Sequence, residues 1–85
     1  MELIYEKGAI KSLKRIQPKV AQAIQTALEK IAANPFGAPL NAEPMEGTKA
    51  GFRLQHGDWR IIYVVNQDKQ IVTVVDVKPR GRAYR

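Results

Sequence analysis

The pair Gly57-Asp58, set between two apolar segments, constrains the fold of this chain more than any other feature. Residues 51–56 alternate apolar and polar side chains, and residues 59–66 are apolar over most of their length. A two-residue connection with glycine first is typical of a type II′ turn, which joins antiparallel strands in a tight hairpin. The sequence therefore predicts a β-hairpin here and excludes a helix from this part of the chain.

The rest of the chain predicts two helices and two further strands around the hairpin. Apolar residues recur at helical spacing over residues 9–16 and 18–33, and Pro18 stands in a first helical turn, where proline is tolerated. Apolar segments at residues 2–6 and 70–78 predict strands, and the proline- and glycine-rich segment before the hairpin predicts a loop. The predicted fold is α+β: a short N-terminal strand, a helical hairpin and a three-stranded antiparallel meander.

The hairpin turn also predicts which side chains share a face of the sheet. With a two-residue loop, Gln55 lies opposite Arg60, and Arg53 lies opposite Ile62. Directly opposed residues share a face, and side chains alternate along each strand. One face therefore carries Arg53, Gln55 and Arg60. The other, predicted to be the core face, carries Phe52, Leu54, Trp59, Ile61 and Tyr63.

The second turn of the meander determines what the last strand adds to the arginine face. A three-residue loop at residues 67–69 places Arg60 opposite Asp76, so that Arg60 either pairs with Asp76 or binds an anion. A slip of one residue would move the side chains of the last strand to the other face. With the three-residue loop, the last strand is predicted to add Val72, Val74, Asp76, Lys78 and Arg80 to the arginine face. This face is then apolar at one end and cationic at the other.

The charge distribution indicates a polyanionic partner. The chain carries a formal net charge of +6, from 14 basic and 8 acidic side chains. Residues 1–48 hold six basic and five acidic side chains, whereas residues 49–85 hold eight and three, with arginine the commonest basic residue. The planar guanidinium group suits phosphate better than an ammonium group does. Nucleic acid is the functional interpretation, and a basic surface that only confers solubility is the alternative.

Composition excludes several kinds of site. The 85 residues contain no cysteine, which excludes disulfides, thiolate zinc sites and cysteine nucleophiles. The single histidine, His56, is expected at the surface and cannot form a multi-histidine metal site. No apolar segment approaches the roughly 18–20 residues that span a bilayer, and the N-terminus lacks a signal-peptide pattern. We expect a single domain, residues 1–85, in the cytoplasm, away from membranes and without metal or other cofactor.

Two segments carry a resemblance to a known group of proteins. Residues 51–63, Gly-Phe-Arg-Leu-Gln-His-Gly-Asp-Trp-Arg-Ile-Ile-Tyr, resemble the G-Y-R-L-R-x-G-D-Y-R-x-x-Y hairpin of the RelE/ParE toxin superfamily. Residues 77–85 are similar to its closing V-x-H/K-R-x-x-x-Y run. The order of the predicted elements also matches, so the resemblance covers essentially the whole chain. It implies a RelE-like α+β fold and a toxin of a type II toxin–antitoxin system.

The resemblance also implies an activity and a set of site residues. RelE-like toxins cleave messenger RNA in the ribosomal A site, whereas ParE-like toxins inhibit DNA gyrase and are not nucleases. The RelE-like branch implies a metal-free endoribonuclease that inhibits translation. Its catalytic positions fall on Arg53, Arg60, Arg80 and Tyr84. Further candidates are Gln55, Arg82 and Glu43, the last being either the loop glutamate that some relatives use or a solvated loop carboxylate.

Two departures from the family pattern weaken or rearrange the implied site. Gln55 replaces a basic residue that relatives often carry, and it can donate a hydrogen bond but cannot neutralise charge. Pro79 stands where relatives often have glycine, histidine or lysine. The implied proton transfer is also demanding, because an ordinary tyrosine has a pKa near 10 and Tyr84 needs neighbouring cations to act as a base.

The resemblance implies two kinds of partner, an antitoxin protein and the ribosome with its messenger RNA. The antitoxin is expected to wrap the helices with an acidic or amphipathic tail and to mask the basic face. Two alternatives remain open from the sequence. One is a ParE-like gyrase inhibitor, and the other is a catalytically weakened toxin that mainly binds its antitoxin.

Overall fold

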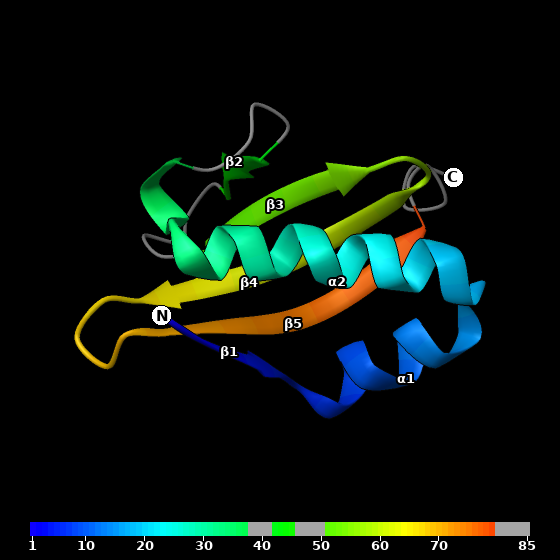
Figure 1. Cartoon of the computed structure of the whole chain (residues 1–85), viewed down its shortest axis with the longest axis horizontal. Coiled ribbons are helices and arrows are strands. Elements are labelled where there is room, and N and C mark those ends of the chain that lie inside the picture. Colours follow the sequence, from blue (N-terminus) through cyan, green and yellow to red (C-terminus); the bar gives the residue numbers. More distant parts are fainter. Residues whose placement is uncertain (38–41, 46–50, 80–85) are drawn as a thin grey trace.

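A five-stranded sheet forms the centre of the computed structural model, which describes residues 1–37, 42–45 and 51–79 (Figure 1). The strand order is β1-β5-β4-β3-β2, with β1 parallel to β5 and all other neighbours antiparallel. The α+β fold predicted from the sequence is confirmed. The elements in chain order are β1 (Glu2–Tyr5), α1 (Lys7–Arg15), α2 (Pro18–Ala33), the 3-10 helix η1 (Pro35–Gly37), β2 (Ala42–Pro44), β3 (Gly51–His56), β4 (Trp59–Asn66) and β5 (Ile71–Pro79).

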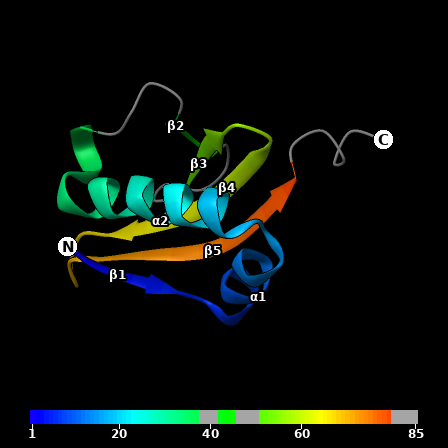
Figure 2. The ribbon, with the colours of Figure 1, turned by 45° about the vertical axis from the view of Figure 1, so that its right-hand side comes forward.

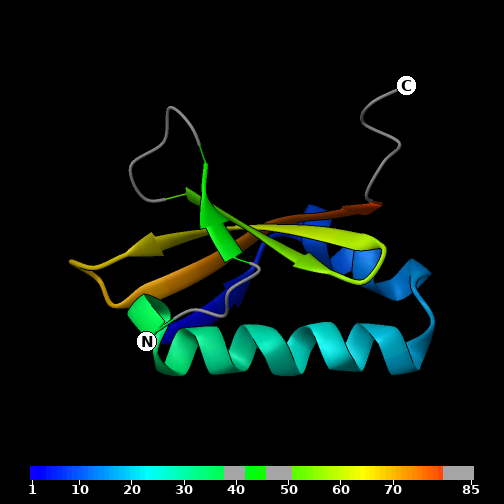
Figure 3. The same cartoon turned by 90° about the horizontal axis from the view of Figure 1, so that it is seen from above.

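Helix α2 covers one face of the sheet, as the views in Figures 2 and 3 show. Its apolar positions Ile24, Leu28 and Ile31 follow helical spacing and are buried. Burying one such side chain fully contributes about 1.5–3 kcal/mol to stability. This layer therefore fixes which face of the sheet is the core face. The buried residues of the sheet are Leu54, Ile61, Tyr63, Val65, Val72, Val74 and Val77.

Strand β1 and helix α1 lie beside β5. Strand β1 pairs with residues 71–74, and α1 packs against β5 where this pairing ends. Ala9 and Leu13 are the buried residues of α1. An added Cβ at Gly8 would lie 4.0 Å from the carbonyl oxygen of Val75, which shows how closely the start of α1 approaches β5. The predicted helical hairpin is confirmed, with α1 beginning two residues earlier than expected.

The predicted hairpin is confirmed together with its register. Gln55 pairs with Arg60, and Arg53 pairs with Ile62 across β3 and β4. Gly57 has a φ of +59°, whereas Asp58 is not among the residues with positive φ, as a type II′ turn requires. The two-residue turn therefore fixes the alternation of the arginine face and the core face, as the sequence predicts.

The predicted second turn is wrong by one residue. Asn66 pairs with Ile71, so the loop contains four residues, 67–70, and not three. Gln70 adopts a φ of +58°, and its side-chain amide donates to the carbonyl of Gln67 over 2.8 Å. Left-handed backbone positions are usually recognised in a sequence by glycine. Because glutamine occupies this position, the sequence carries no indication that the loop has a fourth residue. As a result, Val72 and Val74, predicted on the arginine face, are buried on the core face.

A β-bulge corrects the alternation further along the same strand. Tyr63 pairs with Val74, but its neighbour Ile62 pairs with Asp76, so Val75 is the extra residue of β5. The bulge shifts the register by one more residue. Asp76 and Lys78 therefore lie on the arginine face as predicted, although for a reason that the sequence did not indicate.

The sequence does not predict strand β2. Its three residues lie in the segment expected to be a loop, and they pair with β3 so that Glu43 lies opposite Arg53. Beyond β2, the backbone N–H of Met45 donates to the carbonyl of Gly51 over 2.8 Å. Three residues ending in proline give no alternation pattern that could be recognised, and the strand exists because β3 offers an unpaired edge.

Candidate nucleic-acid interface

The sheet face turned away from α2 carries the predicted site, and we call it the open face (Figure 3). Its side chains alternate along each strand with the buried residues of the core face. Its apolar end lies towards β1, where Ile4 is 39% exposed. The open face includes Ile4, Glu43, Arg53, Gln55, Arg60, Ile62, Val64, Thr73, Asp76 and Lys78.

Three polar side chains cross the open face in one line near the hairpin turn, and we call them the cationic row. Gln55 on β3 pairs with Arg60 on β4, and Arg60 pairs with Lys78 on β5. Arg60 and Lys78 are half-buried, whereas Gln55 is exposed. Directly opposed Cβ atoms in antiparallel strands lie roughly 4.5–5.5 Å apart. Two cations therefore stand side by side at one end of the open face, as predicted for that end.

The neighbouring line of side chains on the open face holds an ion pair. Arg53 donates from Nη2 to Oε1 of Glu43 over 2.7 Å. The side chains are 37% and 64% exposed, so the pair stands in solvent and stabilises the fold by at most about 1 kcal/mol. Glu43 is thus neither an unpaired solvated carboxylate nor distant from the arginines, because β2 holds it against Arg53.

The predicted opposition of Arg60 and Asp76 is wrong. Asp76 lies opposite Ile62, because the longer turn and the bulge together move β5 by two residues relative to β4. The Oδ1 atom of Asp76 accepts a hydrogen bond from the backbone N–H of Val77 over 2.9 Å. Lys78 takes the place opposite Arg60. The family motif specifies no residue at position 78. The place of Lys78 opposite Arg60 could therefore have been predicted only from the length of the turn and the presence of the bulge.

Three of the predicted site residues, Arg80, Arg82 and Tyr84, lie outside the described residues. In the sequence they follow Pro79, which pairs with Trp59 next to the cationic row. The structure brings together four of the seven predicted residues. These four are Glu43, Arg53, Gln55 and Arg60.

The aromatic residues of the hairpin lie on the other face, as predicted. Tyr63 is fully buried, and its ring stacks on Phe52 with centroids 5.4 Å apart. Trp59 is partly buried against the same core. His56, expected at the surface, is half-buried opposite Trp59, where both line a shallow hollow beside Lys19 at the start of α2.

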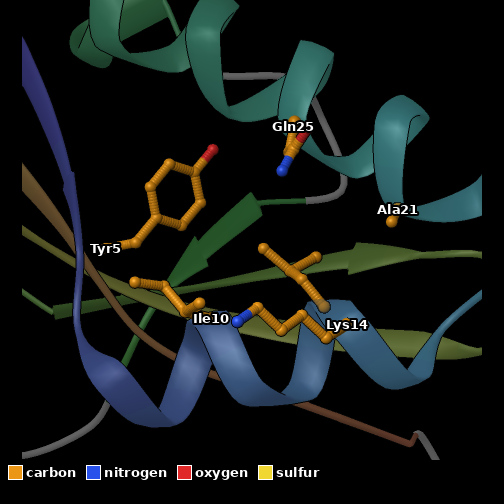
Figure 4. A pocket seen from close by; sticks show the side chains of 6 residues that line it. Tyr5, Ile10, Lys14, Ala21 and Gln25 are labelled. Carbon is orange, nitrogen blue, oxygen red and sulfur yellow. The ribbon is translucent and has the colours of Figure 1, made fainter. Parts of the chain in front are cut away.

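A second surface feature lies between the two helices and the end of β1 (Figure 4). Burial raises the pKa of the Tyr5 phenol above its usual value near 10, and the negative charge of Glu29 raises it further. Ile10 of α1 is 40% exposed at this place. The hollow thus offers apolar surface with a basic side chain at its border. Its lining residues are Tyr5, Ile10, Leu13, Lys14, Ala21 and Gln25.

Two absences hold for residues 1–37, 42–45 and 51–79. Within these ranges no three histidine, cysteine, aspartate or glutamate side chains come together as metal ligands. None of the helices there has the length and apolarity needed to cross a membrane.

Comparison with known proteins gives one family and a consistent set of folds. Residues 3–84 match the family described as "ParE toxin of type II toxin-antitoxin system, parDE". Comparison with curated proteins gives no match. The predicted resemblance to the RelE/ParE superfamily is therefore confirmed by a match over nearly the whole sequence.

Solved structures of RelE toxins have a similar fold. A chain of the archaeal RelE–RelB complex from Pyrococcus horikoshii OT3 has a TM-score of 0.82 at 24% identity, covering 95% of this chain and 96% of that one. The isolated E. coli RelE toxin has a TM-score of 0.81 at 19% identity, with 98% and 87% covered. The YoeB/ParE toxin from Agrobacterium tumefaciens has a TM-score of 0.77 at 19% identity, with 94% and 99% covered. At identities this low, the structural similarity shows a common fold.

Proposed function

The chain belongs to the ParE toxin family of type II toxin–antitoxin systems within the RelE/ParE superfamily, and we propose that it acts in the cytoplasm as a metal-free endoribonuclease on ribosome-bound messenger RNA. The observation that carries this proposal is the cationic row beside the Glu43–Arg53 pair, on a sheet face that α2 leaves uncovered. A strand scaffold holds these side chains at fixed spacing, as catalysis by charge stabilisation requires.

The chemistry proposed for this site uses the RNA as its own nucleophile. The 2′-hydroxyl loses its proton and its oxygen attacks the adjacent phosphorus. The bond from phosphorus to the 5′-oxygen breaks, and that oxygen takes up a proton from water. The products are a 2′,3′-cyclic phosphate and a 5′-hydroxyl. Negative charge builds on the phosphate oxygens during the step, so cations fixed beside them lower the barrier.

Each site residue receives one role in this proposal. Arg60 stabilises the charge that develops on the phosphate, and Arg53 binds the neighbouring backbone. Arg80 stabilises the leaving 5′-oxygen, with Arg82 adding positive charge, and Tyr84 accepts the proton of the 2′-hydroxyl. Gln55 donates a hydrogen bond to the RNA. Glu43 orients Arg53, since its carboxylate is already engaged by that guanidinium group.

Induction of the chain in growing cells tests this function. We expect growth arrest with new 5′ ends inside translated messages, and unchanged DNA supercoiling. Arg60→Ala should relieve the arrest in a folded protein, because the loss of one such electrostatic group costs roughly 10²–10³-fold in rate. Intact messages in arrested cells would overturn the proposal.

A second function, inhibition of DNA gyrase, is favoured by one observation. The family matched by residues 3–84 is described by the name of ParE toxins, and that branch of the superfamily acts on gyrase. The same induction experiment separates the two functions. Gyrase inhibition would alter supercoiling and leave messages intact, and a weakened toxin would cause no arrest.

We further propose that the protein partner is an antitoxin that covers the helices. Several of the similar solved structures are toxins in complex with RelB antitoxins, including those from Pyrococcus horikoshii and E. coli. The hollow between α1 and α2 supports this proposal, because Ile10 is exposed there beside Lys14. An amphipathic segment with acidic residues would bury Ile10 and form an ion pair with Lys14. Replacing Ile10 by aspartate should weaken the complex while leaving toxicity intact.

A further inference from the structure

We propose that Lys78 is an RNA-phosphate ligand that acts together with Arg60, so that the two strands β4 and β5 present a pair of cations to one backbone segment. This inference rests on the proposed function, because it assigns a further residue to the same RNA-binding face. Lys78 lies outside the motif residues of the family, and its place in the site comes from the fold of this chain alone.

Core packing beneath β5 determines where the side chain of Lys78 lies. The bulge at Val75 adds one residue to β5, and beyond it Val77 returns to the core opposite Ile61. Both of these side chains are at least 98% buried, so they hold the register firmly at this point. With Val77 fixed inwards, the next residue must point to the open face. Lys78 is thereby held opposite Arg60.

The positive charges of Arg60 and Lys78 together favour a bound anion. Like charges placed directly opposite each other on neighbouring strands destabilise a sheet. A phosphate bound beside Arg60 and Lys78 would be attracted by both cations and would offset their mutual repulsion. Among the described residues, the carboxylates of Glu43 and Asp76 lie in the line next to the cationic row and not in it.

The two ends of the cationic row differ in charge. Gln55, at the β3 end, can donate a hydrogen bond but carries no charge. The row thus contains two cations only because Lys78 occupies its β5 end. Lys78 is half-buried, as is typical of a lysine whose methylene chain covers apolar surface while its ammonium group stays in solvent. This geometry suits a backbone phosphate that crosses the sheet from β4 to β5.

A binding experiment with an RNA that cannot be cut tests this assignment. The probe is a fluorescent single-stranded 2′-O-methyl RNA oligonucleotide, since it lacks the attacking hydroxyl. Affinity for the full chain is measured over a series of salt concentrations. Each phosphate contact in a single strand contributes about 0.7 to the slope of log affinity against log salt. Lys78→Gln should therefore lower the slope by about 0.7 and the affinity about fivefold at about 0.1 M salt.

Two variants serve as controls. Lys69→Gln removes the same charge from the turn at the opposite end of β5 and should leave the slope unchanged. Lys78→Arg should retain the wild-type slope, because it keeps the cation. Thermal unfolding should show that Lys78→Gln is still folded at the assay temperature, so that a lower slope reflects the lost charge.

The outcomes separate this inference from the proposed function. If the wild-type chain cuts messages and binds the probe, but Lys78→Gln keeps the wild-type slope, Lys78 is not a ligand and the proposed function stands. The same holds if Lys69→Gln lowers the slope equally, because the effect then reflects net charge. If the wild-type chain neither binds the probe nor cuts RNA, both the inference and the proposed function are wrong.

Discussion

Glu43 and Arg53 face each other across β2 and β3, and their charged groups are 2.7 Å apart. Strand β2 has three residues, yet it is the element that brings this carboxylate onto the open face. The ion pair restrains the side chain of Arg53 at a site where a catalytic cation is expected. It also engages the carboxylate that would otherwise be the natural base near the arginines.

The ion pair predicts a mild effect of Glu43→Gln on catalysis. Glutamine can still accept a hydrogen bond from Arg53 but cannot take up a proton. We expect single-turnover cleavage to fall by less than about tenfold, whereas loss of a general base costs about 10²–10⁴-fold. Glu43→Ala should lower the rate further, because it releases Arg53. A loss above 100-fold in Glu43→Gln alone would make Glu43 the base.

The buried hydroxyl of Tyr63 predicts a stabilising substitution. Its oxygen has no hydrogen-bond partner among the described residues, although the side chain is fully buried. An unsatisfied buried hydroxyl costs about 1–3 kcal/mol, and phenylalanine would keep the stacking on Phe52. We expect Tyr63→Phe to raise the free energy of unfolding by about 1 kcal/mol, measured by denaturant titration. A loss of stability would show that the hydroxyl has a partner.

The same hydroxyl predicts how stability depends on pH. Burial raises the pKa of Tyr63 above the value near 10 that it has in the unfolded chain. Above that pH the tyrosine loses its proton in the unfolded chain before it does so in the folded protein. This deprotonation stabilises the unfolded state, so the free energy of unfolding falls as the pH rises. Tyr63→Phe should make this fall shallower by up to about 1.4 kcal/mol per pH unit. Equal slopes for both proteins between pH 10 and 11 would contradict the account.

The second turn predicts a further stabilising change. Gln70 has a φ of +58°, in the region that favours glycine. Gln70→Gly removes a strain of about 1–2 kcal/mol but loses the hydrogen bond to Gln67, which contributes about 0.5–1.5 kcal/mol. We expect the free energy of unfolding, measured by denaturant titration, to rise by at most about 1.5 kcal/mol. Gly57→Ala is the opposite test, because a Cβ there has no atom within 4 Å and would meet only backbone strain. We expect Gly57→Ala to lower stability by about 1 kcal/mol.

Tyr84 and Arg53 should differ in which step they affect. Tyr84→Phe should slow single-turnover cleavage and leave ribosome binding nearly unchanged, because a proton-transfer contact exists only in the transition state. Arg53→Ala should also weaken binding, and its effect should shrink as salt rises, because counterions screen a charge–phosphate contact. Full activity in Tyr84→Phe would remove the hydroxyl from the mechanism.

The parts of the fold that follow from local rules could be predicted from the sequence. The glycine at position 57 specifies a two-residue turn, and from it the register of β3 and β4 follows without further information. Helix α2 follows from the spacing of Ile24, Leu28 and Ile31. Both predictions rest on periodicities of the backbone, which tertiary packing did not override here.

The parts that failed depend on contacts distant in sequence or on unusual backbone conformations. The length of the second turn depends on a left-handed Gln70, and the bulge at Val75 depends on Val77 packing into the core. Strand β2 forms only because β3 is present to pair with it. These three features decide which charged residues meet, so the pairing of Arg60 with Lys78 could not be predicted.

Cleavage of messenger RNA by the purified chain on stalled ribosomes, with a chelator present, tests the central claim most directly. We expect cuts that leave a 2′,3′-cyclic phosphate and a 5′-hydroxyl, and a rate lowered roughly 10²–10³-fold by Arg60→Ala. Supercoiling by gyrase, assayed with the same protein, should be unaffected. Uncut messenger RNA together with inhibited gyrase would contradict the account.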